Sequence, residues 1–153
     1  MYLTVHATAG LALAKYIPNP ILAFVAAVLS HLVLDAIPHG DEYLTDNRLP
    51  LLFRRRRFLG AAILDSMIML GFVLLYIYTT PLLPGLTVGA ALVGALLPDA
   101  LQGLHFISRE KWLTKYAHWH GHKINNFPKL KLNWQAGMLV QIFTLTALWL
   151  IAL

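Results

Sequence analysis

Histidine and aspartate recur at helical spacing in the pattern His31-x-x-x-Asp35-x-x-x-His39-x-Asp41. A separation of four residues places the imidazole of His31 and the carboxylate of Asp35 on one face of a helix. His39 continues that face, although Pro38 can bend or end the helix there. Imidazole and carboxylate together suit zinc, with manganese or iron as alternatives. The competing interpretation is a hydrogen bond between helices, or a histidine that reaches toward lipid headgroups.

A second group of histidines alternates along the sequence as His118, His120 and His122. An extended strand would point all three side chains the same way, and Gly121 would let the backbone pack closely against a ligand. We therefore predict metal ligands at His118 and His122, and a catalytic base or further ligand at His120. Short histidine-rich stretches also occur in interfacial loops, which is the alternative.

Three more ionisable residues, His6, Asp65 and Asp99, lie within or at the ends of apolar segments. A carboxylate near the middle of a membrane span costs on the order of 3 kcal/mol, and each strongly apolar residue returns roughly 0.5 kcal/mol. The segment that contains Asp65 can therefore still insert. An ionisable group in a bilayer indicates a functional site, so we include all three residues among the candidate metal ligands. The alternative for Asp65 is a protonated carboxyl that bonds to a neighbouring helix.

The composition places these residues in a membrane protein. The chain has 153 residues, of which 58% are hydrophobic and 12% charged, and such values are not typical of soluble domains. The length suits one compact unit, so residues 1–153 form a single integral membrane domain. Cysteine is absent, which excludes disulfides and thiolate ligands. Any metal must therefore use nitrogen and oxygen donors.

Hydrophobic runs predict an all-α, polytopic membrane bundle of about five segments. Three of the runs have about 20 residues or more, enough to cross a hydrocarbon core of roughly 30 Å. Residues 21–37 are a marginal span, and residues 3–17 form a tilted span, a re-entrant helix or an interfacial helix. Turns at 18–20 and 80–81 give two hairpins, followed by one last helix. The predicted segments are 3–17, 21–37, 58–79, 82–101 and 134–153.

The positive charges predict the orientation. Of the 12 Lys and Arg residues, all but Lys15 fall in the loops 40–57 and 102–132. The positive-inside rule makes both loops and the N-terminus cytoplasmic, in a multi-pass protein of the cell (inner) membrane. Topology thus explains the net charge of +5 better than a nucleic-acid partner, and we expect none. Membrane lipids, including anionic headgroups, are the expected partners. Because the ionisable groups gather in the cytoplasmic half, a transporter is disfavoured.

Three short pieces of the chain resemble the LexA-regulated, membrane-bound metal-dependent hydrolases of bacteria and archaea. The first piece is residues 6–10, which begin at His6, and the second is residues 29–39, which contain His31 and Asp35. The third is the Leu-Pro-Asp element that ends at Asp99. The resemblance implies metal-site positions at His6, His31, Asp35 and Asp99, and hydrolase activity.

The leading hypothesis is a cytoplasm-facing, metal-dependent hydrolase that acts on a phosphoester or another lipid-linked ester. A divalent metal, zinc first, would activate water and polarise the scissile group. His39, Asp41 and His120 are the candidates for the general base or a further ligand. The second hypothesis is a non-catalytic membrane protein that binds metal, haem or lipid through the same residues. Haem would need two imidazoles that face each other across a cavity, and His6 with His31 could in principle supply them.

Overall fold

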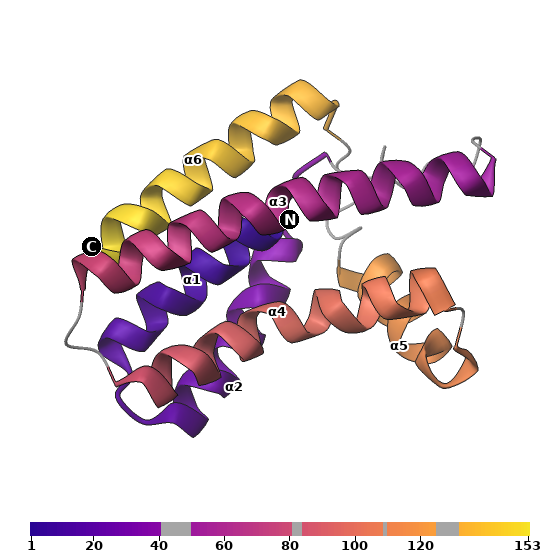
Figure 1. Cartoon of the computed structure of the whole chain (residues 1–153). Coiled ribbons are helices and arrows are strands. Elements are labelled where there is room, and N and C mark those ends of the chain that lie inside the picture. Colours follow the sequence, from indigo (N-terminus) through magenta and orange to yellow (C-terminus); the bar gives the residue numbers. More distant parts are fainter. Residues whose placement is uncertain (41–49, 81–83, 109, 125–131) are drawn as a thin grey trace.

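All regular elements that the structure describes are helices, as the sequence predicts. The structure is a computed structural model that describes residues 1–40, 50–80, 84–108, 110–124 and 132–153. Figure 1 shows the arrangement of the helices. The five longer helices are α1 (Leu3–Tyr16), α2 (Pro20–Asp35), α3 (Leu51–Thr79), α4 (Gly85–Ser108) and α6 (Trp134–Ala152). The short helix α5 (Thr114–His118) lies between a 3-10 turn, η2 (Lys111–Leu113), and a π-helical turn, η3 (Trp119–Ile124).

Three helices, α3, α4 and α6, are long and apolar enough to cross a membrane, and α2 is a shorter apolar helix. The bounds of two helices differ from the predicted segments. α3 begins at Leu51 and therefore includes Arg54 to Arg57, and α4 continues through Pro98 to Ser108. Both helices extend because charged and polar residues at an interface end a hydrophobic run without ending the backbone helix. The 29 residues of α3 reach about 44 Å.

The first two helices form the predicted hairpin. The side chain of Asn19 accepts hydrogen bonds from the backbone N–H groups of Ile21 and Leu22 and so caps α2. Pro20 occupies the first turn, where its missing N–H is not needed. The hydroxyl of Thr87 donates to the carbonyl of Pro18 at 2.8 Å, which ties this turn to the start of α4.

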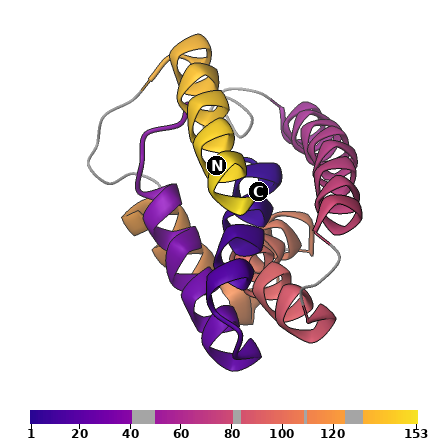
Figure 2. The same ribbon diagram turned by 90° about the vertical axis from the view of Figure 1, so that its left-hand side faces the viewer.

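Helix α1 lies at the centre of the bundle, where it packs against α2, α3, α4 and α6 (Figure 2). Ten of its 14 residues are buried. Small residues permit close contact between helices. A Cβ added at Gly10 would lie 3.0 Å from the Ala91 carbonyl oxygen, and one added at Gly94 would collide with the carbonyl of Phe24. These contacts hold α1 and α2 tightly against α4.

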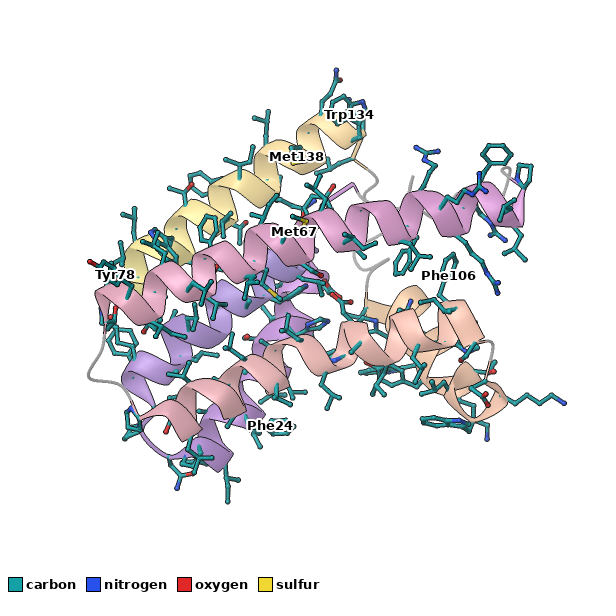
Figure 3. All side chains as sticks on the ribbon, viewed as in Figure 1. Phe24, Met67, Tyr78, Phe106, Trp134 and Met138 are labelled. Atoms are coloured by element: carbon teal, nitrogen blue, oxygen red, sulfur yellow. The ribbon has the colours of Figure 1, made fainter. Side chains whose placement is uncertain are left out.

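The outer face of the bundle is apolar, as expected for a membrane protein. Large exposed hydrophobic side chains occur along α3 and α6, for example Ile63 and Leu139. Figure 3 shows Trp134 at the start of α6 and Tyr78 at the end of α3, toward opposite ends of the molecule. Both rings are exposed, in positions suited to interfacial anchors.

Candidate metal centre

Four nitrogen and oxygen donors converge where α2, α4 and η3 meet. His31 and Asp35 come from the last turns of α2, Asp99 from α4, and His120 from η3. One ligand atom from each residue lies within 4.8 Å of the others, so the group could hold a metal ion. We call these four residues the His/Asp group. All except Asp99 are fully buried, and the Asp99 side chain is 22% exposed.

Most of the separations within the His/Asp group are short. The Oδ2 atom of Asp35 lies 3.2 Å from Nε2 of His31 and 3.2 Å from Nε2 of His120. The two imidazole Nε2 atoms are 3.3 Å apart. Ligands of a tetrahedral zinc with bonds of 2.0–2.2 Å are separated by about 3.4 Å. Asp99 is farther away, with Oδ1 at 3.7 Å from Nε2 of His31.

The protonation of His31 follows from its backbone contact. Its Nδ1 lies 2.7 Å from the carbonyl oxygen of Ala95, and because a carbonyl can only accept, Nδ1 carries the proton. In the neutral ring, Nε2 then presents a lone pair to the carboxylate of Asp35. Among the described residues, Oδ2 of Asp35 has no hydrogen-bond partner, so two electron-rich atoms face each other. A cation between them relieves this repulsion, and a backbone carbonyl on the far ring nitrogen is the usual support of a metal-binding histidine.

His6 and His39 border the His/Asp group. Nε2 of His6 lies 3.0 Å from Oδ1 of Asp35, and the His6 ring stacks on His31 with centroids 3.9 Å apart. This stack leaves no space for a porphyrin between the two imidazoles, so the structure contradicts the predicted haem ligation by this pair. His39 donates from Nδ1 to the carbonyl of Ile37 and directs Nε2 to the amino group of Met1 at 3.0 Å. That amino group also contacts the Asp35 carboxylate.

Asp65 belongs to α3, and its side chain lies beside the N-terminus of α1. Its carboxylate accepts from the backbone N–H groups of Leu3 and Thr4 and from the Thr4 hydroxyl. The first N–H groups of a helix have no partner within the helix, and membrane hydrocarbon offers none. The carboxylate therefore acts as a cap supplied by another helix, and it is separate from the His/Asp group.

The expectation of an extended strand at His118, His120 and His122 is wrong, because residues 114–124 are helical. The helical turn directs His120 into the His/Asp group, whereas His118 is exposed. The side chain of His122 and the whole of Asp41 lie outside the described residues.

Two residues that the sequence analysis did not name as site residues support the centre. The ring of Tyr116 stacks on His120 with an interplanar angle of 9°, and its hydroxyl donates to the carbonyl of Pro98 at 3.0 Å. Burial, and then the carboxylates of Asp99 and Asp35, raise the pKa of Tyr116 to about 12, so this hydroxyl remains a donor at neutral pH.

Gln141 of α6 is the second such residue. Its side chain accepts from the N–H of Tyr2 at 2.8 Å and donates to the carbonyl of His39 at 3.1 Å. A buried amide within an apolar helix is a signal that could have identified it from the sequence.

The fold and this centre together define a helical bundle of the membrane type with a buried His/Asp group that could hold a metal ion. The chain matches no family model, no curated protein and no solved structure.

Proposed function

We propose that this protein is an integral membrane, metal-dependent hydrolase that acts on a phosphoester or another lipid-linked ester. The convergence of His31, Asp35, Asp99 and His120 from three segments of a membrane-type bundle carries this proposal. Burying ionisable groups in a membrane costs free energy, so their presence there indicates a function. The resemblance of residues 6–10, 29–39 and 96–99 to the LexA-regulated hydrolases supports the same assignment.

In this proposal, His31, Asp35 and His120 hold the metal, zinc first, with manganese or iron as alternatives. Catalytic zinc sites use three protein ligands and keep one position open. A bound divalent metal would lower the pKa of water to about 7 and polarise the scissile group. Ala95 and Tyr116 orient the histidines, through the His31 Nδ1 bond and the stack on His120.

Asp99 takes the role of proton acceptor, because it alone among the four is partly exposed. Its carboxylate accepts a proton from the attacking water while the water oxygen bonds to the phosphorus or the acyl carbon. The ester bond to the alcohol oxygen then breaks, and that oxygen takes up a proton. His6, with Nε2 at 3.8 Å from Oδ2 of Asp99, positions the carboxylate.

The proposed location is the cell (inner) membrane, with the His/Asp group on the cytoplasmic side. The clusters of Arg54 to Arg57 and of the lysines after Arg109 support this orientation through the positive-inside rule. Cysteine-accessibility labelling of single-cysteine variants at Tyr16 and Lys115, in sealed cells, tests it. Labelling of Lys115Cys from the outside would overturn the orientation.

The test of function measures metal content and hydrolysis on the same detergent-purified protein. The substrates are two water-soluble esters, bis-p-nitrophenyl phosphate and p-nitrophenyl acetate. We expect about one equivalent of metal, reduced more than about tenfold in Asp35→Asn and His120→Ala. His118→Ala is the matched control, because His118 is exposed in the adjoining turn, and it should change neither quantity.

Asp99→Asn separates catalysis from metal binding. The proposal requires that this variant keep its metal and lose about 10²-fold or more in hydrolysis. Hydrolysis of neither ester by metal-loaded wild type would contradict the proposed activity.

A non-catalytic metal protein is the second candidate, and the burial of the centre favours it. Structural zinc sites are closed by four protein ligands, and the His/Asp group offers four donors, three of them fully buried. If Asp99→Asn loses its metal and the wild type hydrolyses no ester, this second function is the correct one.

A further inference from the structure

A cleft beside the His/Asp group is lined by residues of α3 and α4 and by Met1, Tyr2 and Leu3 at the start of the chain. Its volume is about 530 Å³, within the range of roughly 300–1,000 Å³ typical of small-molecule sites. Asp99 of the His/Asp group lies in its wall. The remaining wall is mainly apolar and includes Phe58, Leu59 and Ala62 of α3 and Leu96 and Leu104 of α4.

The cleft opens onto the outer surface of the bundle. Three large apolar side chains of its lining are exposed: Leu59 at 39%, Leu104 at 45% and Ile107 at 46%. The main helix contacts of α3 are with α1, and the ring pair of Phe58 and Phe106 joins α3 to α4 near one end of the cleft. In a membrane, these exposed apolar side chains meet lipid, and a hydrocarbon chain can enter from the side without crossing water.

A cation, Arg55, adjoins the cleft through its contact with Ile107, one of the lining residues. Arg55 donates from a terminal guanidinium nitrogen to the carbonyl of Ile107 at 3.1 Å, while its buried Nε has no hydrogen-bond partner among the described residues. The rings of Phe58 and Phe106 meet beside it, with centroids 4.8 Å apart, and Figure 3 shows Phe106 between α3 and α4. A buried donor on a charged group requires an acceptor, and a phosphate suits an arginine best.

The cleft also contains an unpaired acceptor. Gln102 lines it, and in the part of the chain that the structure describes, the buried Oε1 of this side chain has no hydrogen-bond partner. A ligand hydroxyl would satisfy this oxygen. The cleft therefore offers a site for a hydroxyl donor and an apolar channel, and Arg55 provides a site for an anion next to it.

Distance along α4 separates the anion site from the His/Asp group. Ile107, which Arg55 contacts, follows Asp99 by eight residues, or about 12 Å of helix. A lipid phosphate held by Arg55 is therefore too far from Asp99 to be the group under attack. In a glycerophospholipid, the glycerol backbone separates the phosphate from the ester that joins the hydrocarbon chain, so this acyl ester can reach Asp99.

We propose that the cleft binds a glycerophospholipid of the surrounding bilayer, with the phosphate at Arg55, the acyl ester at Asp99 and the chain between Ala62 and Leu96. This inference rests on the proposed hydrolase function and specifies its substrate class. Water adds to the acyl carbon, the bond from that carbon to the glycerol oxygen breaks, and this oxygen takes up a proton. The products are a fatty acid and a glycerol-phosphate compound.

The test uses lysophosphatidic acid, which has one chain, one phosphate and one free hydroxyl, in nanodiscs containing the metal-loaded protein. We expect release of fatty acid, and release of inorganic phosphate instead would overturn the inference while leaving the hydrolase function in place. Failure to cleave lysophosphatidic acid, in protein that does cleave the water-soluble esters, would also overturn the inference alone. Failure on every ester would contradict the proposed function itself.

Binding is tested separately with lysophosphatidic acid that carries a photoreactive diazirine on its chain. We expect crosslinks to α3 and α4, reduced at least about fivefold in Ala62→Phe, which fills the cleft, and in Arg55→Ala. The matched controls are Ile63→Phe and Arg56→Ala, both exposed on the same helix, and they should crosslink like the wild type. Ala100→Phe blocks the cleft from α4 and replaces Ala62→Phe if that variant does not fold. Equal crosslinking in the blocked and control variants would refute the site.

Discussion

Replacement of Asp65 by alanine tests whether this carboxylate is a helix cap or a metal ligand. The substitution removes the acceptor for the N–H groups of Leu3 and Thr4 and for the Thr4 hydroxyl. The hydroxyl keeps a second acceptor, the backbone oxygen of Asp65 at 3.2 Å. A cap role predicts lower stability with unchanged metal content, whereas a ligand role predicts loss of metal.

The contacts of Asp65 set the size of the effect. Loss of an N-cap side chain costs about 0.5–2 kcal/mol. A hydrogen bond to a charged group contributes about 1.5–3 kcal/mol, of which the Thr4 hydroxyl loses only part. We therefore expect Asp65→Ala to lower the free energy of unfolding by about 2–4 kcal/mol. Asp65→Asn keeps one acceptor oxygen and should cost about 1 kcal/mol, as should Thr4→Val, which removes the hydroxyl alone.

The assay is unfolding of the purified protein in mixed micelles as the fraction of denaturing detergent rises, followed by circular dichroism. The double variant Asp65→Ala with Thr4→Val should lose less stability than the sum of the single variants, because the two side chains share one interaction. Metal content measured on the same samples should remain at the wild-type value. Wild-type stability in Asp65→Ala, or loss of metal from folded Asp65→Asn, would refute the cap.

Three other predictions concern packing, metal linkage and α6. Gly94→Ala should destabilise the bundle by about 1–3 kcal/mol, because the added Cβ collides with a carbonyl of α2. At Gly89 no atom of the described residues lies within 4 Å of an added Cβ, so Gly89→Ala should stabilise the bundle by about 0.5–1 kcal/mol. The melting temperatures of the two variants in detergent test this difference. Zinc at about 100 times its dissociation constant should add about 2.7 kcal/mol to the stability of the wild type. A chelator should remove this gain, and Asp35→Asn should not show it. Gln141→Leu removes the side-chain hydrogen bonds to the N–H of Tyr2 and the carbonyl of His39 and should cost about 1–3 kcal/mol. Thr146→Leu, at an exposed position of α6, should be close to neutral in the same assay.

The all-α bundle could be predicted from the sequence because the lengths of apolar runs and the prolines of the turns determine it. Pro20 and Asn19, for example, begin α2 as the sequence indicates. The start of α3 could not be predicted in this way. A hydropathy pattern ends at Arg57, but the backbone helix includes Arg54 to Arg57, since arginine is a good helix former.

The members of the His/Asp group were all among the candidates, because ionisable residues are conspicuous in an apolar chain. The sequence does not indicate which of the candidate residues join the His/Asp group and which have another role. Asp65 and Asp99 look alike in sequence, but the rotation of each helix places one at the start of α1 and the other beside His31. The selection of His120 over His118 depends on the helical turn of residues 114–124, which the alternation of histidines does not indicate.

The burial of α1 has a consequence for how the protein enters a membrane. Ten of the 14 residues of this helix are enclosed by the other helices, and several of them, including Thr4, His6 and Thr8, are polar. On its own, such a helix gains little from contact with lipid, so it cannot insert stably before its neighbours exist. We expect α1 to remain at the interface during synthesis and to join the bundle together with α2, its partner in the hairpin. The metal-site candidates His6 and His31 would thus be brought together in one biosynthetic step.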